Sequence, residues 1–237
     1  MKIGGAAFEA VGVFSPEAVR QMLGGRFRAS FMPLVETIAG GTIRGVAAIF
    51  GPPSATSDTY AKIAGELAKA DILTLATGGP AAACAKAGLM VTEAKDRGGR
   101  GLQELCEAVG CPPVLYVGSF EETARILMLF AQVVQEAGLA DFGGLPIAAV
   151  CADAPRRECL PIGQCFVSSG IFTVRAGGFP FGEAPALRDY LASVIEGEVG
   201  GRWAFEADPA RMAQLVQEAI EKKRGAAGQA QASVISC

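Results

Sequence analysis

The sequence contains no histidine among its 237 residues. Histidine has a side chain that titrates near neutrality, and it supplies the base of serine and cysteine triads and many of the ligands of zinc. Its absence therefore excludes Ser-His and Cys-His nucleophiles and His-ligated zinc sites. Any enzyme built on this chain needs different chemistry.

Long apolar runs and excess positive charge are also lacking. No stretch approaches the roughly 20 apolar residues of a membrane span, and the N-terminus has no uninterrupted apolar region of the kind found in signal peptides. The formal net charge is −3, without a sustained basic stripe, which argues against a nucleic-acid partner. We therefore expect a cytoplasmic protein that binds neither nucleic acid nor membrane.

Aromatic residues make up only 7% of the chain and charged residues 19%, whereas 51% is hydrophobic and 31 residues are glycine. This composition suits helices packed closely on a parallel sheet. A chain of this length can bury most of its apolar surface in one large domain. The seven cysteines are an odd number scattered through apparent core segments, which predicts free thiols in reducing surroundings.

Short apolar runs alternate with segments of helical periodicity, as in βαβ units. The sequence therefore predicts an α/β fold with a mostly parallel sheet of about five to six strands. The predicted strands are Ile43 to Phe50, Ile72 to Thr77, Pro113 to Val117, Pro146 to Val150, Ile171 to Val174 and Arg202 to Phe205. The predicted helices between them are Thr59 to Lys69, Ala81 to Ala87, Leu102 to Val109, Glu121 to Ala137, Arg157 to Ser168 and Ala184 to Ile195.

Capping residues mark the first and last helices. Ser15-Pro16 begins a helix that Gly24-Gly25 ends, and a second helix is expected before the first strand. Asp208-Pro209 begins the last helix, which ends in lysine and arginine. Because periodicity stops near Gly225, we predict one domain over residues 1–224 and a disordered tail over 225–237.

Three predicted strands end in a turn that contains glycine: Gly51-Pro52, Gly78-Gly79 and Gly118-Ser119-Phe120. Ligands of open parallel sheets bind outside the carboxyl ends of the strands, so these turns indicate a site. They do not make a phosphate cradle. No G-x-G-x-x-G follows a strand, no Walker lysine is present, and Pro80 stands where a cradle uses a backbone N–H.

A series of segments, in this order, resembles the C-terminal domain of the anaerobic nickel–iron–sulfur carbon monoxide dehydrogenases, in the hybrid cluster protein superfamily. The similarity extends from about Phe8 to Arg224 and implies a Rossmann-like, three-layer domain. The family's helical N-terminal region and middle domain have no counterpart here, so we expect a stand-alone domain. The segments are EAVGVFSPEAV, MLGG, FMPLVETIAGGTIRGVAAIFG, AKADILTLATGGPAAACAKAGL, LCEAVGCPPVLYVGS, RILMLFAQVVQEAG, LPIAAV, IGQCFVSSGIFTV and FEADPARMAQLVQEAIEKKR.

The resemblance also implies where the family's cluster ligands would lie. Each of the three turns carries a cysteine in the family, at positions held here by Pro52, Gly79 and Phe120. A lysine that assists CO oxidation aligns with Glu158. None of these residues supplies a thiolate or an amine, so we expect no catalytic residue, no metal site and no cofactor. The vacated pocket is predicted at Gly51, Pro52, Gly78, Gly79, Ser119, Phe120, Cys151 and Glu158.

Three cysteines fit roles in the core. Cys84 lies on an alanine-rich predicted helix, where a small residue packs close to the sheet. Cys106 and Cys111 are five residues apart and lack the second ligand pair of a structural zinc site. We interpret all three as packing residues.

Cys151, Cys159 and Cys165 leave an alternative open, because one ends a predicted strand and the others lie on the following helix. They are either core residues, the reading that we prefer, or a replacement iron–sulfur, nickel or other redox site. Glu158 is either a buried acid in the vacated pocket or, as we favour, a surface residue. Glu121 and Glu122 are interpreted as first-turn carboxylates that favour the helix dipole.

Three hypotheses of function follow. The first is a catalytically silent relative of the dehydrogenases that serves as a scaffold, accessory subunit or interaction module, self-associating or docking on a redox enzyme. The second is a domain that binds a small anionic or apolar molecule in the vacated pocket. The third is an oxidoreductase with a different metal centre. Analogy of fold locates a site but does not choose among them.

Overall fold

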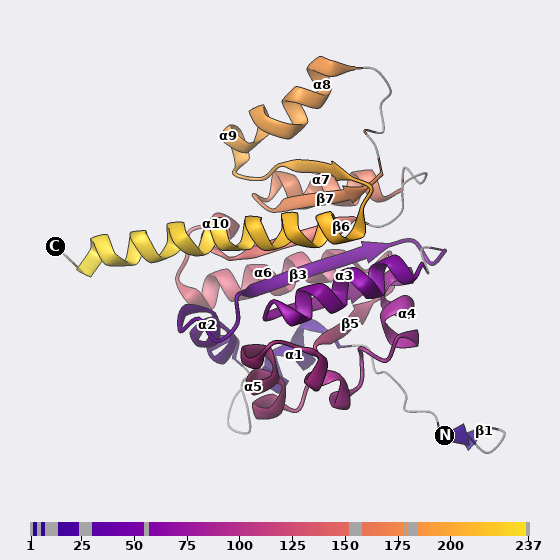
Figure 1. Ribbon diagram of the computed structural model, residues 1–237. Coiled ribbons are helices and arrows are strands. Elements are labelled where there is room, and N and C mark those ends of the chain that lie inside the picture. Colours follow the sequence, from indigo (N-terminus) through magenta and orange to yellow (C-terminus); the bar gives the residue numbers. More distant parts are fainter. Residues whose placement is uncertain are drawn as a thin grey trace.

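The computed structural model describes residues 2–3, 6–7, 14–23, 30–54, 57–151, 158–177, 179 and 184–235. In these ranges the main feature is a six-stranded sheet with helices on both faces (Figure 1). A short antiparallel pair, β1 (Lys2–Ile3) with β2 (Ala6–Ala7), precedes it. The strands of the main sheet are β3 (Gly45–Gly51), β4 (Ile72–Thr77), β5 (Val114–Gly118), β6 (Ile147–Cys151), β7 (Phe172–Ala176) and β8 (Trp203–Glu206).

The strand order across the sheet is β5-β4-β3-β6-β7-β8, and every neighbouring pair is parallel. Strand order reverses between β3 and β6, which begin the two halves of the sheet. This is the doubly wound order in which ligands bind at the carboxyl ends, beside the reversal. The predicted α/β, Rossmann-like fold is confirmed, and each predicted strand lies within two residues of an observed one.

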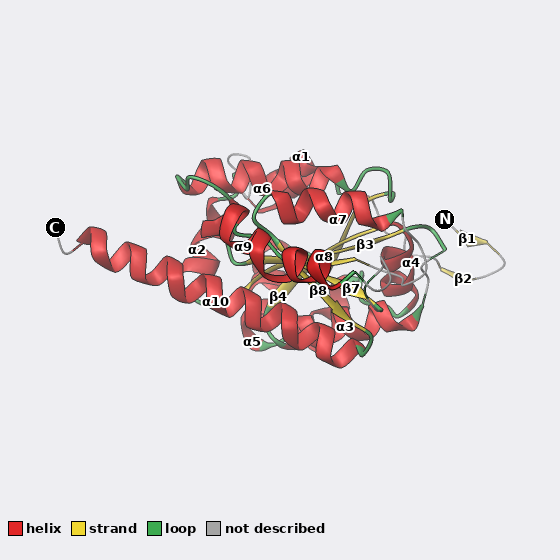
Figure 2. Cartoon of the chain, turned by 90° about the horizontal axis from the view of Figure 1, so that it is seen from above, coloured by secondary structure: helices red, strands yellow, loops and turns green. Residues whose placement is uncertain are grey.

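Helices cover both faces of the sheet, as the view along it shows (Figure 2). α1, α2, α6 and α7 contribute to one buried cluster, and α3, α4 and α10 contribute to the other. No helix in the described ranges combines the length and the apolar character that a membrane span requires. The helices are α1 (Pro16–Leu23), α2 (Met32–Ala39), α3 (Asp58–Lys69), α4 (Gly78–Lys86), η1 (Thr92–Arg97), α5 (Arg100–Val109), α6 (Ala124–Ala137), η2 (Phe142–Gly144), α7 (Cys159–Ser168), α8 (Pro185–Asp189), η3 (Tyr190–Val194), α9 (Ile195–Val199) and α10 (Pro209–Ile235).

The central strand β3 is buried along its whole length. Val46, Ala48 and Phe50 belong to one hydrophobic cluster, whereas Ala47 and Ile49 belong to the other. A strand covered on both faces needs an almost continuous apolar sequence, which explains why this run lacks polar alternation.

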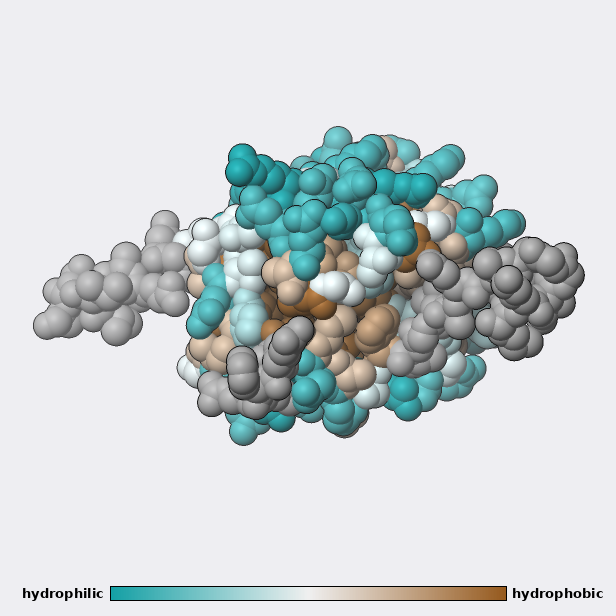
Figure 3. Space-filling model, turned by 90° about the horizontal axis from the view of Figure 1, so that it is seen from below, coloured by the Kyte–Doolittle hydropathy of each residue, from teal (hydrophilic) through white to brown (hydrophobic). Residues whose placement is uncertain are grey.

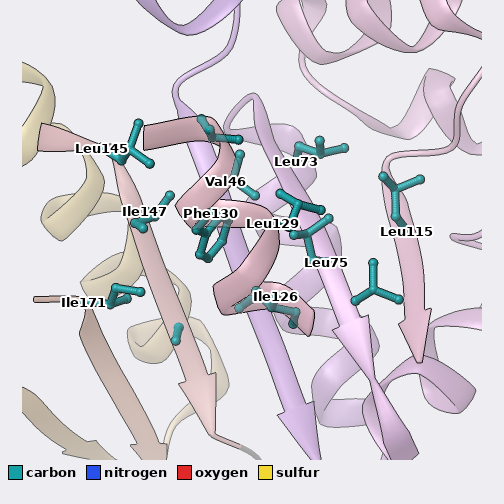
Figure 4. Packing of buried hydrophobic residues seen from close by; sticks show 14 of the residues in the cluster. Val46, Leu73, Leu75, Leu115, Ile126, Leu129, Phe130, Leu145, Ile147 and Ile171 are labelled. Carbon is teal, nitrogen blue, oxygen red and sulfur yellow. The ribbon is translucent and has the colours of Figure 1, made fainter. Parts of the chain in front are cut away.

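The cluster on the α6 side of the sheet is the larger of the two. Ile126, Leu129 and Phe130 of α6 lie over the strands, close to Val46 and Leu75 (Figure 4). These contacts hold the helix that follows the third glycine turn, so the sheet and α6 position that turn together.

Two predicted helix caps are confirmed. The Ser15 hydroxyl accepts a hydrogen bond from the Ala18 N–H at 3.2 Å, and Asp208 accepts one from the Arg211 N–H at 3.2 Å. Each side chain satisfies a donor that the first turn of a helix leaves unpaired. The predicted stop at Gly24-Gly25 lies outside the described residues.

Four helices differ from the prediction. α4 begins at Gly78, three residues before the predicted Ala81, and α6 begins at Ala124 and not at Glu121. The segment after Ala184 contains a π-helical turn, η3, between α8 and α9. α10 continues to Ile235, whereas we expected a disordered tail from Gly225. Residues 225–235 contain four alanines and two glutamines, which have high helix propensity, and two glycines, which cost about 1 kcal/mol each.

Candidate functional site

The carboxyl ends of four neighbouring strands meet at the reversal of strand order. Phe50 of β3 is in register with Thr77 of β4 on one side and with Cys151 of β6 on the other, and Thr77 pairs with Gly118 of β5. The residues immediately after these strands therefore lie along one edge. Seven predicted pocket residues belong to this edge: Gly51, Pro52, Gly78, Gly79, Ser119, Phe120 and Cys151.

The first two glycine turns are in direct backbone contact, through a parallel bridge between Gly51 and Gly78. A Cβ atom added to Gly78 would lie 2.0 Å from the Gly51 carbonyl oxygen and 3.0 Å from the Phe120 Cβ. Gly78 also has a φ of +63°, a conformation that other residues rarely adopt. The glycine pair therefore begins α4 directly after β4, packed against both neighbouring turns.

The third turn is closed by its own side chains. The Ser119 N–H donates to Oε2 of Glu122 at 2.9 Å, and Glu122 forms an ion pair with Arg125 at 2.5 Å. The pKa of Glu121 is lowered by its own backbone N–H and by the Ser119 hydroxyl. Both glutamates thus fold the turn before the helix, which is why α6 begins at Ala124 and why our interpretation of them as first-turn residues needs correction.

Two buried hydroxyls lie beneath the turns. Thr77 and Thr123 are fully buried, and their Oγ1 atoms are 2.9 Å apart. The Thr123 hydroxyl also donates to the Phe120 carbonyl at 2.6 Å. The sequence analysis did not single out this pair, because a threonine on a β-strand and another near a helix start are both common. These polar groups bind each other and the backbone.

The thiols nearest the edge are held protonated. Burial raises the pKa of Cys84 to about 12, and its Sγ donates to the Tyr60 carbonyl at 3.9 Å. Burial and the neighbouring Cys159 hold the pKa of Cys151 well above its usual range, and its Sγ donates to the Cys159 carbonyl at 3.6 Å. Burial thus favours the neutral thiol at both positions.

The structure separates the remaining candidates. Cys151 and Cys159 are fully buried and adjacent, whereas Cys165 is exposed further along α7. Glu158 is exposed, just before α7 begins, as the surface reading requires. Among the described residues, no group of three or more cysteine, aspartate or glutamate side chains is placed to hold a metal ion.

Arg175 is a functional candidate that sequence reasoning missed. It lies near the carboxyl end of β7, pairs in register with Cys151 and is only 2% exposed. Its charge lowers the pKa of Cys151, although burial outweighs that effect. The available signal was a charged residue inside the apolar run IFTVRA. A buried guanidinium gives this edge of the sheet a permanent positive charge.

Sequence comparison identifies the fold and its ancestry. The pattern of the Prismane/CO dehydrogenase family matches residues 2–210. The chain belongs to the Prismane/CO dehydrogenase family. Carbon monoxide dehydrogenase 1 of Methanosarcina acetivorans is 39% identical over 218 residues, which are 91% of this chain and 34% of that protein. The chain therefore spans about a third of the length of such relatives.

Solved structures of the family have the same fold. A nickel-free carbon monoxide dehydrogenase from Thermococcus sp. AM4 superposes with a TM-score of 0.83 at 32% identity, covering 91% of this chain and 34% of that one. Carbon monoxide dehydrogenase IV from Carboxydothermus hydrogenoformans gives a TM-score of 0.84 at 31% identity, with 90% and 35% covered. The resemblance inferred from the sequence is thereby confirmed.

A nickel–iron–sulfur cluster does not fit the described residues at this edge. Pro52, Gly79 and Phe120 stand where the family resemblance implies cysteines, and their side chains contain no atom that can coordinate a metal. Cys84 and Cys151 are buried, and each thiol donates to a backbone carbonyl. We derive no chemistry through such a cluster here.

The contact between Gly51 and Gly78 predicts the effect of a single methyl group. Gly78→Ala should lower the free energy of unfolding by about 2 to 4 kcal/mol, because the backbone conformation and the collision with the carbonyl oxygen both cost energy. Gly138→Ala is the matched control, since Gly138 has a φ of +68° and no neighbour within 4 Å of the added atom. It should cost about 1 to 2 kcal/mol. Urea denaturation measures both, and equal losses would contradict the proposed contact.

Proposed function

We propose that this chain is a catalytically silent member of the carbon monoxide dehydrogenase family, a pseudoenzyme that acts as an interaction module. The observation that carries the proposal is the edge formed by Pro52, Gly79 and Phe120. The fold that positions the family's cluster is retained, but the side chains at these positions donate nothing to a metal. A retained scaffold without its ligands favours a role in assembly over catalysis.

The distribution of exposed apolar side chains supports a role in assembly. Five large apolar residues are exposed in the described ranges, and four of them lie in the segment from α8 through η3 to α9. This segment packs at the β8 end of the sheet, at the top of the molecule (Figure 1). The four residues are Leu187, Tyr190, Val194 and Val199. Such a concentration is typical of a surface that contacts another protein.

An apolar groove lies beside these residues, between α7, the α8–η3 segment and β8. Its volume is about 440 Å³. Trp203 donates its indole N–H to Oε1 of Gln164 at 2.9 Å and stacks on Phe205 with ring centroids 5.9 Å apart. The indole N–H of Trp203 and the side-chain oxygen of Gln164 are therefore hydrogen-bonded to each other within the groove. The lining residues are Leu160, Pro161, Gln164, Leu187, Leu191, Trp203 and Phe205.

The opposite edge of the sheet is apolar as well. Figure 3 views the molecule from the β5 side and shows hydrophobic atoms gathered between hydrophilic rims. β5 is the edge strand here, and its Tyr116 is half-buried, as is Phe14. The Phe14 N–H donates to the Tyr116 carbonyl at 2.7 Å, so Phe14 lies beside β5. Because relatives are three times longer, this edge is a second candidate for contact with a further domain or subunit.

The α8–α9 surface makes a prediction about self-association. Leu187→Lys should weaken association of the chain by about tenfold or more, since it places a charge at the centre of an apolar contact. Met128→Lys on α6 is the control, because Met128 is 56% exposed on a helix outside this surface. Light scattering across a concentration series measures both variants. A wild-type chain that stays monomeric, or equal effects of the two substitutions, would contradict self-association through this surface.

A second experiment tests whether the chain binds a metal cluster or oxidises CO. After anaerobic reconstitution with iron, sulfide and nickel, the protein should retain no stoichiometric metal, show no sulfur-to-metal absorption bands and fail to reduce a viologen dye under CO. The reason is the lack of thiolate ligands at Pro52, Gly79 and Phe120. Stoichiometric iron that Cys151→Ser removes would instead favour an oxidoreductase with a different metal centre.

One observation favours a second candidate function, the binding of a small anion. Arg175 brings a positive charge to the carboxyl end of β7, where α/β folds bind ligands. A ligand that binds the native state must raise its unfolding temperature. Inorganic phosphate and small carboxylates should then raise the unfolding temperature of the wild-type chain. Arg175→Met should abolish that rise while leaving the fold intact. This result would support anion binding over a purely structural role for Arg175.

A further inference from the structure

A pair of thiols meets at the opposite end of the sheet, where α5 turns into β5. Gly110 ends α5 in the left-handed conformation, with a φ of +71°. The N–H groups of Gly110 and Cys111 both donate to the Cys106 carbonyl, at 2.9 and 3.1 Å. These two hydrogen bonds to one carbonyl oxygen fold the chain back on itself. As a result the Sγ atoms of Cys106 and Cys111 are only 3.9 Å apart.

The two thiols have different surroundings. The Cys111 S–H donates to the Cys106 sulfur, which lowers the pKa of Cys106, and the charge of Lys95 lowers it further against the effect of burial. The same hydrogen bond and burial raise the pKa of Cys111. Lys95 lies on η1 and binds Glu107 of α5 at 2.6 Å. The surroundings therefore favour the thiolate form of Cys106 and the protonated form of Cys111.

We propose that Cys106 and Cys111 form a redox-active dithiol, which a hydroperoxide converts into an intramolecular disulfide. The Cys106 sulfur attacks one peroxide oxygen, the O–O bond breaks, and the leaving alkoxide takes a proton to become an alcohol. Cys106 is then a sulfenic acid. The Cys111 sulfur attacks the Cys106 sulfur, the S–O bond breaks, and water leaves with the proton of Cys111. Two thiols are oxidised, and the hydroperoxide is reduced to alcohol and water.

The geometry requires little movement. A disulfide has an S–S length of about 2.05 Å, so the sulfurs must approach by roughly 1.9 Å from their separation of 3.9 Å. Rotation of the two side chains supplies most of this, because the backbone bonds to the Cys106 carbonyl already hold the residues together. Both cysteines are buried, at 2% exposed for Cys106 and 1% for Cys111, and the charge of Lys95, which pairs with Glu107, acts on the Cys106 thiol. A small oxidant therefore reaches the pair when the chain around this ion pair opens locally.

The sequence makes the test simple, because trypsin releases both cysteines in one peptide. Residues 101–125 contain no internal lysine or arginine and no further cysteine. After a brief exposure of the reduced, folded chain to a small excess of hydrogen peroxide, this peptide should lose the mass of two hydrogen atoms and resist alkylation. Dithiothreitol should restore both thiols. The wild-type chain suffices for this measurement, so no variant has to fold.

Variants test the order of the steps. Cys111→Ser should leave a sulfenic acid on Cys106 that dimedone traps, and Cys106→Ser should abolish trapping in this peptide. Cys165→Ser is the control, since that thiol is exposed on α7 and distant in sequence, and the variant should form the disulfide as the wild type does. The proposal is overturned if peptide 101–125 keeps two alkylatable thiols at a peroxide concentration that oxidises Cys165. It is also overturned if the disulfide that forms joins two chains.

Discussion

The contact between the Gly51 carbonyl and Gly78 sets the shape of the sheet's carboxyl edge. It places the first two turns against each other at a distance that excludes any side chain on Gly78, and it brings Phe120 against the same point. The hydroxyls of Thr77 and Thr123 then lie inward, bonded to each other and to the backbone. Pro52 and Gly79 are buried and Phe120 is half-buried against the core, and none of the three side chains has an atom that can coordinate a metal. The edge therefore keeps the strand ends at which this fold binds ligands, without metal-binding side chains at Pro52, Gly79 and Phe120.

The fold does not require metal-binding side chains at this edge, because most of its hydrophobic contacts lie in the two clusters that cover the sheet. β3 is buried on both faces, between the helices of two hydrophobic clusters, and its packing uses Val46 to Phe50 and not the turn that follows. The family's architecture is therefore retained over most of this chain, while the positions implied for cluster ligands carry proline, glycine and phenylalanine. Fold and chemistry are separable here, since the fold is set by burial and the chemistry by a few side chains at the carboxyl ends of the strands.

The sequence was sufficient to predict the sheet, because every strand is a short apolar run bounded by glycine, proline or charge. Ile72–Thr77 is observed as predicted, and the start of α7 differs by two residues.

The start of α6 was missed because Glu122 bonds to the Ser119 N–H, a contact that depends on the three-dimensional turn. The meeting of Cys106 with Cys111 was missed because it depends on the left-handed conformation of Gly110. Arg175 had a visible signal, but its burial could not be read from one sequence.

The central claim is that no metal cluster binds beside Pro52, Gly79 and Phe120. The most direct test is anomalous diffraction at the iron absorption edge, from crystals of the protein reconstituted anaerobically with iron, sulfide and nickel. Our account predicts no anomalous peak at the carboxyl edge of the sheet. A strong peak within bonding distance of atoms in these three turns, or of Cys151, would contradict it.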